Sequence, residues 1–161
     1  MAAKKTSSKT GKSKRPIDAI GMLRADHKKV SEMFDRYENL RTEKQKKDLA
    51  LEICKELTVH AQLEEEIFYP AVWNAIDEED LMDEATVEHQ SAKDLIAQIE
   101  ESNPSEELFD AKVKVLGEYI KHHVKEEQNE MFPEVKGNGL DLKALGEQMR
   151  ARKAELVRED D

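Results

Sequence analysis

Two short stretches of this 161-residue sequence share a pattern that restricts how the chain can fold. In each stretch a histidine is followed by a glutamate four residues later and by a proline ten residues later; the stretches are His60–Pro70 and His123–Pro133. On an α-helix, residues four positions apart lie on one face, so each stretch directs an imidazole and a carboxylate toward the same point. Two such pairs that face each other across a core predict a dinuclear metal site.

The apolar residues recur mostly at steps of three and four, and we find no segment with the alternation expected of a strand. Four amphipathic stretches are separated by polar runs and by breaks such as Asn103-Pro104 and Gly137-Asn138-Gly139. This pattern predicts an all-α fold, an up-down-up-down four-helix bundle followed by a short C-terminal fifth helix. The predicted organisation is a disordered Lys-rich tail over residues 1–15, the bundle over residues 16–136 and the C-terminal helix over residues 137–161.

A histidine interrupts the apolar stripe of every predicted bundle helix, and the spacing of these histidines repeats. His27 precedes His60 by 33 residues, and His89 precedes His123 by 34. Both His27 and His89 follow an acidic residue. The chain therefore resembles two helical hairpins related by a pseudo-twofold axis. Such a bundle would bring six side chains to one level of its core, namely His27, His60, Glu64, His89, His123 and Glu127.

Simpler interpretations explain part of this set. A single histidine on an apolar face is more often a core residue than a ligand, and His122, one position off the stripe, is expected at the surface or behind the site. A mononuclear zinc site needs only three or four of the groups and leaves the others buried without a role. Ferritin-like sites use Glu-x-x-His, which is not the order or spacing here. Two metal ions bridged by Glu64 and Glu127 use all six groups, and imidazole with carboxylate suits iron, manganese or zinc.

The charge distribution bears on partners. The formal charge is −10, but residues 1–15 carry six basic residues and no acidic one, so the remainder has 20 basic and 36 acidic residues. A body of charge −16 argues against a specific nucleic-acid partner. We interpret the tail as a solubilising segment, and weak electrostatic contact with an anionic polymer or surface is the alternative. The short apolar runs argue against a membrane, and no secretory signal is evident. With the single cysteine, Cys54, these features favour a cytoplasmic protein.

Over about residues 17–135 the sequence resembles the hemerythrin-like family, also described as the HHE cation-binding domain. It matches that family's iron-binding signature at His27, His60, Glu64, His89, His123 and Glu127. The resemblance implies a four-helix bundle, a non-haem di-iron cofactor with two iron ions, and bridging roles for the two glutamates. Lys93 stands where oxygen-carrying hemerythrins have a second third-helix histidine, and Gln128 stands where they have an aspartate. The chain thus resembles the four-histidine, two-glutamate branch, whose extra open coordination position favours redox reaction or sensing over oxygen storage.

Three functions remain open at this stage. The first is a di-iron protein that binds or reacts with dioxygen, peroxide or nitric oxide in sensing, storage or stress protection. Its pocket is expected to have an apolar wall with Leu23, Ile67, Ile96 and Leu116 as candidates. The second is a di-iron enzyme that decomposes hydrogen peroxide, although the sequence offers no separate general acid. The third is a helical interaction protein whose histidines fill the core and whose protein partner is unknown.

Overall fold

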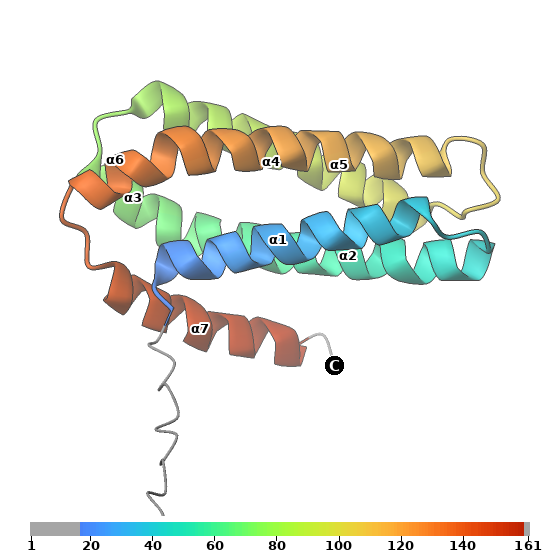
Figure 1. The fold of residues 1–161 in the computed structure, drawn as a ribbon, viewed down its shortest axis with the longest axis horizontal. Coiled ribbons are helices and arrows are strands. Elements are labelled where there is room, and N and C mark those ends of the chain that lie inside the picture. The colour runs from blue at the N-terminus through green and yellow to red at the C-terminus, as the bar shows by residue number, and fades with distance from the viewer. Residues whose placement is uncertain (1–16, 160–161) are drawn as a thin grey trace, which may run out of the picture.

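A computed structural model describes residues 17–159, so the predicted tail lies outside the described residues. Every regular element within this range is helical, which confirms the predicted fold class (Figure 1). Two antiparallel hairpins form the four-helix bundle, and the side chain of Asp18 caps the first helix by accepting a hydrogen bond from the backbone N–H of Gly21. The bundle helices are α1 (Ala19–Glu38), α2 (Glu43–Leu63), α4 (Glu79–Glu101) and α5 (Phe109–Glu126).

The second and fourth bundle helices both pass through a π-helical turn into a short α-helix. The turn η1 (Glu64–Phe68) joins α2 to α3 (Tyr69–Ala75), and η2 (Glu127–Met131) joins α5 to α6 (Phe132–Gly137). A proline inside a helix favours a kink or an end, and here the helix continues through Pro70, with its irregularity just before that residue. A proline ring clashes with the carbonyl four residues back, and a wider turn relieves this crowding. Each π turn begins at a glutamate of the repeated pattern.

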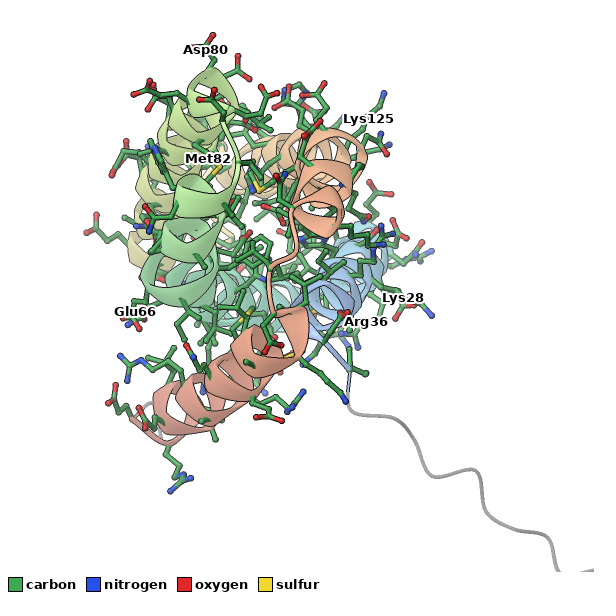
Figure 2. All side chains as sticks on the ribbon, turned by 90° about the vertical axis from the view of Figure 1, so that its left-hand side faces the viewer. Lys28, Arg36, Glu66, Asp80, Met82 and Lys125 are labelled. Atoms are coloured by element: carbon green, nitrogen blue, oxygen red, sulfur yellow. The ribbon has the colours of Figure 1, made fainter. Side chains whose placement is uncertain are left out.

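The C-terminal helix α7 (Leu142–Glu159) packs against one side of the bundle, beside α1 and α2 (Figures 1 and 2). It spans 18 residues, as many as α5, and lies within the range 137–161 predicted for a C-terminal helix. Met149 and Leu156 bury their side chains against the bundle. At Gly146 an added Cβ would lie 2.9 Å from the backbone nitrogen of Ala19, so glycine permits the close approach of α7 to α1.

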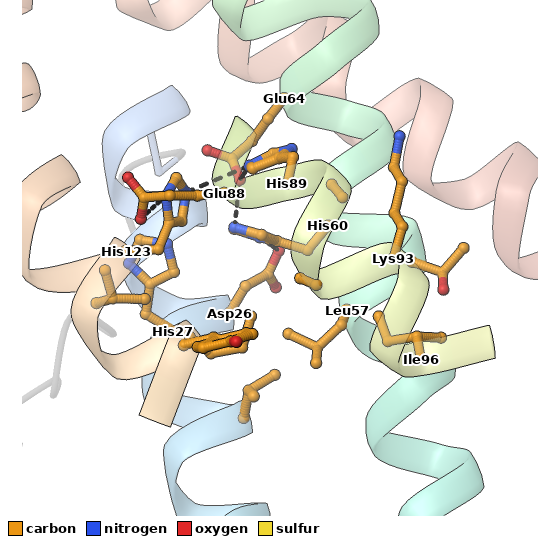
Figure 3. Close-up of a pocket in the computed structure, with 17 residues that line it drawn as sticks. Asp26, His27, Leu57, His60, Glu64, Glu88, His89, Lys93, Ile96 and His123 are labelled. Carbon is orange, nitrogen blue, oxygen red and sulfur yellow. Dashed lines mark hydrogen bonds and ion pairs between the residues drawn. The ribbon is translucent and has the colours of Figure 1, made fainter. Parts of the chain in front are cut away.

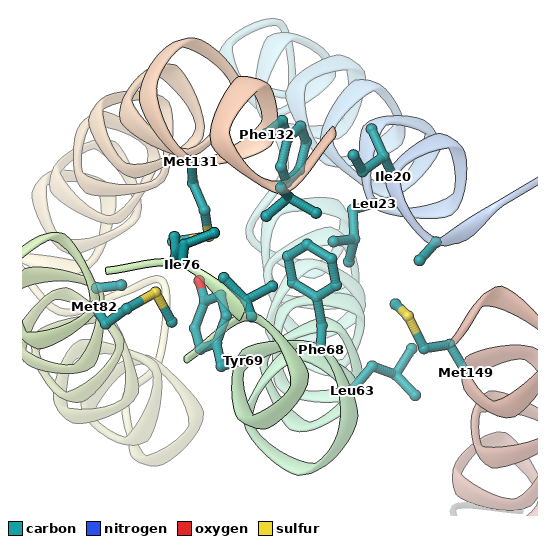
Figure 4. Packing of buried hydrophobic residues seen from close by; sticks show 14 of the residues in the cluster. Ile20, Leu23, Leu63, Phe68, Tyr69, Ile76, Met82, Met131, Phe132 and Met149 are labelled. Atoms are coloured by element: carbon teal, nitrogen blue, oxygen red, sulfur yellow. The ribbon is translucent and has the colours of Figure 1, made fainter. Parts of the chain in front are cut away.

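The core has an apolar cluster at each end and a polar layer between them. One cluster lies at the π-turn end and includes Phe68 and Phe132, which are fully buried (Figure 4). The other lies toward the opposite end and includes Ile53 and Leu116. The six predicted site residues lie between these clusters, so rigid packing on both sides holds the polar layer. No helix among the described residues is long and apolar enough to cross a membrane.

Candidate metal centre

The structure brings all six predicted site residues together in the middle of the bundle. None is more than 8% exposed. They form two groups, in each of which the nearest nitrogen and oxygen atoms lie within 4.8 Å of one another. The groups are His27 with His60 and Glu127, and Glu64 with His89 and His123. Each group therefore takes side chains from both hairpins, which places the centre at the interface between the repeated halves.

Glu127 connects the two groups. Its Oε1 atom lies 3.2 Å from Nε2 of His27, and its Oε2 atom lies 3.1 Å from Nε2 of His123. Helical spacing brings His123 to Glu127, whereas His27 arrives from α1 on the neighbouring hairpin. One carboxylate oxygen thus faces each group, which is the arrangement required of a carboxylate that bridges two cations.

Glu64 reaches both groups in a similar way. Its Oε1 atom lies 2.8 Å from Nε2 of His60 and 3.6 Å from Nε2 of His89 (Figure 3). The side chain is completely buried. Burial alone would raise the pKa of Glu64, but the charge of His60 and the close contacts with His60 and His89 hold this pKa well below its usual range. The site therefore favours an ionised carboxylate at the centre of the protein.

Several polar atoms of the centre are buried without a hydrogen-bond partner among the described residues. They include both ring nitrogens of His27, Nε2 of His60, both carboxylate oxygens of Glu64 and Oε1 of Glu127. Some of these atoms lie close to one another, but the angles between them are unsuitable for a hydrogen bond. Leaving such an atom unpaired costs about 1–3 kcal/mol. Imidazole nitrogen and carboxylate oxygen are donors for iron, manganese and zinc, so the residues present fit a metal ion that would satisfy these atoms.

The buried carboxylates of the site also favour positive charge close to them. Burial lowers the pKa of His60, but the charge of Glu64 and the hydrogen bond with Asp26 outweigh it and raise this pKa to about 10. Burial likewise opposes protonation of His123, whereas the contacts with Glu127 and Glu88 raise its pKa to about 11. Without a metal ion, protons on these imidazoles balance the buried carboxylates. Metal ions would take over this charge and displace the protons.

In each hairpin, an acidic residue precedes the histidine of the first helix. This acidic residue supports a candidate metal ligand on the second helix. Asp26 lies with Oδ2 3.0 Å from Nδ1 of His60, and Glu88 lies with Oε2 3.4 Å from Nδ1 of His123. A carboxylate behind one imidazole nitrogen fixes the ring orientation and the tautomer. Each carboxylate therefore directs Nε2 of its histidine toward the centre, and the acid-His pairs of the sequence acquire a structural reason.

Tyr69 belongs to the site and was missed by the sequence analysis. Its hydroxyl donates a hydrogen bond to Oε2 of Glu127 at 2.6 Å, and it lies 3.1 Å and 3.2 Å from Nε2 of His89 and His123. Burial and the charge of Glu127 raise the pKa of Tyr69 well above its ordinary value. The equivalent residue in the second half is Phe132, which stacks on His27 at a centroid distance of 6.2 Å. Comparing the residue before proline in the two stretches would have singled out this hydroxyl.

A cavity of about 140 Å³ adjoins the side of the centre that faces the second apolar cluster. Of the four residues proposed for an apolar wall, only Ile96 lines it. Leu23 and Ile67 belong to the cluster at the π-turn end, and Leu116 lies deeper in the other cluster. The apolar lining instead consists mainly of Val30, Leu57, Ala61, Ala92, Ile96, Ile120 and Val124.

His122 lies at the surface, which is one of the two positions expected for it. Its side chain is 66% exposed and its Nε2 atom lies 3.1 Å from Oε1 of Glu126. Lys93, at the position where oxygen carriers have a histidine, is half-exposed and pairs with Glu65 at the surface. Neither residue directs a ligand atom into the buried centre.

Comparisons with known proteins give the family. The family model described as Hemerythrin HHE cation binding domain matches residues 18–135, and this chain belongs to that family. The crystal structure of a Hemerythrin HHE cation binding domain-containing protein from Mycobacterium kansasii is similar, with a TM-score of 0.73, 24% identity and 87% of each chain covered. At that identity the similarity shows the shared fold.

A curated relative gives a further comparison. A protein of Nostoc sp. (strain PCC 7120 / SAG 25.82 / UTEX 2576) described as a DNA nickase is 30% identical over 128 residues. The match covers 80% of this chain but 36% of the relative. The chain therefore spans little more than a third of the length of that relative.

Proposed function

We propose that this chain is a non-haem di-iron protein whose buried centre binds or reacts with a small oxidant: dioxygen, peroxide or nitric oxide. The observation that carries the proposal is the reach of the two buried glutamates, each of which approaches histidines of both groups. A single ion would leave one group unsatisfied, whereas two ions bridged by Glu64 and Glu127 use every member. Iron held there would supply open coordination positions and one-electron redox chemistry.

The cavity supports a small ligand. Its volume of about 140 Å³ is close to that of engineered apolar cavities of about 150 Å³, which stay dry and admit benzene or xenon. Dioxygen, nitric oxide and hydrogen peroxide fit within such a space, and large substrates do not. The apolar lining also limits the access of water to the centre. Lys93 pairs with Glu65 outside the centre, so this position offers no additional ligand from α4.

Decomposition of hydrogen peroxide is a second candidate, and the position of Tyr69 favours it. Its hydroxyl lies within hydrogen-bond distance of Glu127 and close to two histidines of the centre. A tyrosine hydroxyl is protonated at neutral pH, so Tyr69 could donate a proton to a peroxide oxygen held nearby. The sequence analysis found no general acid for this reaction, and Tyr69 would supply one.

DNA cleavage has weaker support. The nickase description belongs to a relative of which this chain matches 36%, and the net charge of this chain is −10. A negative surface repels the phosphate backbone and does not gain the counterion release that drives DNA binding.

Metal loading followed by exposure to oxidants tests the proposal. After anaerobic reconstitution with ferrous iron, we expect about two irons per chain and a change in the near-ultraviolet and visible spectrum on addition of dioxygen, peroxide or nitric oxide. His60→Ala and Glu127→Ala should each lower the iron content well below one per chain. His122→Ala, which removes an exposed histidine with its own glutamate four residues later, is the matched control and should retain two irons.

Retention of two irons by both His60→Ala and Glu127→Ala would contradict the proposed site. Peroxide decomposition is measured separately as oxygen evolution from the iron-loaded protein. A rate well above that of the same concentration of free iron supports the enzyme. A rate equal to that of free iron would contradict the enzyme and would leave binding or sensing of the oxidant as the proposed function.

A further inference from the structure

The C-terminal helix reaches one half of the centre through a chain of charged side chains. Lys153 on α7 donates a hydrogen bond from Nζ to Oδ1 of Asp26 at 2.8 Å. The other oxygen of Asp26, Oδ2, lies 3.0 Å from Nδ1 of His60. Lys153 is thus linked by a single carboxylate to a candidate metal ligand. Asp26 is 8% exposed, so water screens this link only weakly.

Other contacts fix α7 at the height where Lys153 reaches Asp26. Arg152 donates from Nε to Oε2 of Glu66 at 2.8 Å and from Nη2 to Oε1 of the same residue at 3.3 Å. Glu66 belongs to the π turn η1. Met149, one turn earlier on α7, is fully buried, and Gly146 lets the helix backbones approach closely. A two-point guanidinium pair and an apolar anchor hold the position of Lys153 more firmly than a lone surface ion pair would.

In the other half of the centre, the counterpart of Asp26 is Glu88, and it has different neighbours. Glu88 supports His123 at the longer distance of 3.4 Å. Glu88 lies beside another carboxylate, Glu126, and beside the exposed His122, with their nearest oxygen and nitrogen atoms within 4.8 Å of one another. The carboxylate behind His60 therefore has an ammonium partner from α7, whereas the carboxylate behind His123 belongs to a group with Glu126 and His122.

We propose that Lys153 is a positioning residue for the metal ion held by His60, and that it acts through Asp26 to make the two metal positions inequivalent. This inference rests on the proposed di-iron function. The ammonium group fixes the orientation of Asp26 and thereby holds Nε2 of His60 toward its metal position more firmly than Nε2 of His123 is held. The controlling element lies in α7, beyond the residues 18–135 that the family model matches.

Replacement of Lys153 tests the inference in the full-length, iron-loaded chain. Lys153→Met should raise the dissociation constant of one iron roughly tenfold, at the low end of the effect of partners behind a metal ligand, and leave the other iron unchanged. Release of iron to a chelator measures both steps. Mössbauer spectra should show two distinct iron environments in the wild type and a change confined to one of them in Lys153→Met. Lys153→Arg, which retains the charge, should restore much of the wild-type behaviour.

The matched control is Lys143→Met, the same substitution at an exposed lysine of the same helix. It should leave both irons and both spectral components unchanged. In an Asp26→Asn background, Lys153→Met should have no further effect, because the link to His60 is already altered. Circular dichroism reports whether each variant folds. If Lys153→Met does not fold, Asp26→Asn alone must still perturb one iron selectively.

Failure of this inference is distinguishable from failure of the proposed function. A wild-type chain that binds fewer than two irons contradicts the di-iron function itself. A wild-type chain with two irons whose affinities and spectra are unaffected by Lys153→Met contradicts only the role of Lys153. An equal effect on both irons, or an effect that persists in Asp26→Asn, also overturns it, because the change would not pass through the Asp26–His60 link.

Discussion

The two hairpins of the bundle contain the same parts in the same order, but they differ in what surrounds those parts. In both, an acidic residue and a histidine on one helix precede a His-x-x-x-Glu pair, a π turn and a proline on the next. The residue directly before the proline is Tyr69 in the first half and Phe132 in the second. Helix α7 packs on the first hairpin and supplies Lys153 to Asp26. The repeat therefore provides a symmetric ligand set, and the surroundings make the two halves chemically distinct.

The symmetric parts follow from backbone geometry. Helical spacing aligns each histidine with its glutamate, and each π turn begins at that glutamate and ends two residues before the proline. The asymmetric parts are single side chains that a bundle of this kind does not require. Tyr69 and Phe132 both fill space beside an imidazole, but only Tyr69 adds a hydroxyl. We therefore expect changes to the symmetric parts to abolish metal binding and changes to the asymmetric parts to alter reactivity.

The largest effect should come from removing a shared carboxylate. Ferrous iron at a free concentration about 1,000 times its dissociation constant should raise the free energy of unfolding of the wild type by about 4 kcal/mol for each iron bound. Glu64→Gln and Glu127→Gln should each abolish most of this increase, because each carboxylate reaches both groups. Anaerobic thermal melts with and without iron measure the difference.

Equal melting of the wild type with and without iron would contradict this account. It would instead favour the interpretation of the bundle as an interaction protein whose histidines fill the core.

Exchange of the aromatic residues before the prolines tests the chemical difference between the halves. Tyr69→Phe should lower the rate of peroxide consumption by about 100-fold, the low end of the effect of a general acid, without lowering the iron content. Phe132→Tyr is the matched control in the second half and should leave Tyr69 and its rate unaltered. Stopped-flow absorbance with iron content measured on the same samples checks both. An unchanged rate in Tyr69→Phe would remove the hydroxyl from the reaction.

The carboxylates behind the histidines should have a smaller effect. Asp26→Asn and Glu88→Gln should each weaken binding of one iron by about 10- to 100-fold. The effect of Asp26→Asn should be the larger, because its contact with His60 is 3.0 Å whereas that of Glu88 with His123 is 3.4 Å. Chelator competition measures both constants. Equal losses in the two variants would mean that the halves respond alike despite their different neighbours.

Sequence pattern was sufficient for the bundle and for bringing the six candidate residues together in its core, since helical periodicity and the repeat place them on core faces. It was insufficient for Tyr69, because its position depends on the π turn that shifts the helix face before Pro70. The role of Lys153 depends on how α7 packs across α1, which periodicity does not determine. The prediction of the residues that line the cavity was mostly wrong, because the packing of the two apolar clusters determines which residues face the centre.

The smallest effect concerns a contact between the hairpins far from the centre. The hydroxyl of Tyr37 donates a hydrogen bond to Asp110 at 2.7 Å, and Lys46 pairs with the same carboxylate. Tyr37→Phe should lower the free energy of unfolding of the metal-free protein by about 1 kcal/mol at neutral pH. Urea unfolding measures this difference, and an unchanged value would mean that the contact does not hold the hairpins together.

The same contact gives a pH dependence. The hydrogen bond from Tyr37 and then the contacts with Lys46 outweigh partial burial and lower the pKa of Asp110. A lowered folded-state pKa stabilises the protein above the unfolded value of about 3.9 and loses this contribution as the pH falls. The gap between the wild type and Tyr37→Phe should therefore narrow below about pH 4. A gap that widens on acidification would contradict this assignment.

The most direct test of the central claim is an anomalous difference map at the iron absorption edge from crystals of the iron-loaded protein. The account predicts two peaks roughly 3.5–4 Å apart, the usual separation in dinuclear sites. One should lie beside His27 and His60, the other beside His89 and His123, with Glu64 and Glu127 between them. A single peak, no peak, or a peak confined to the surface beside His122 would contradict the assignment of a bridged di-iron centre.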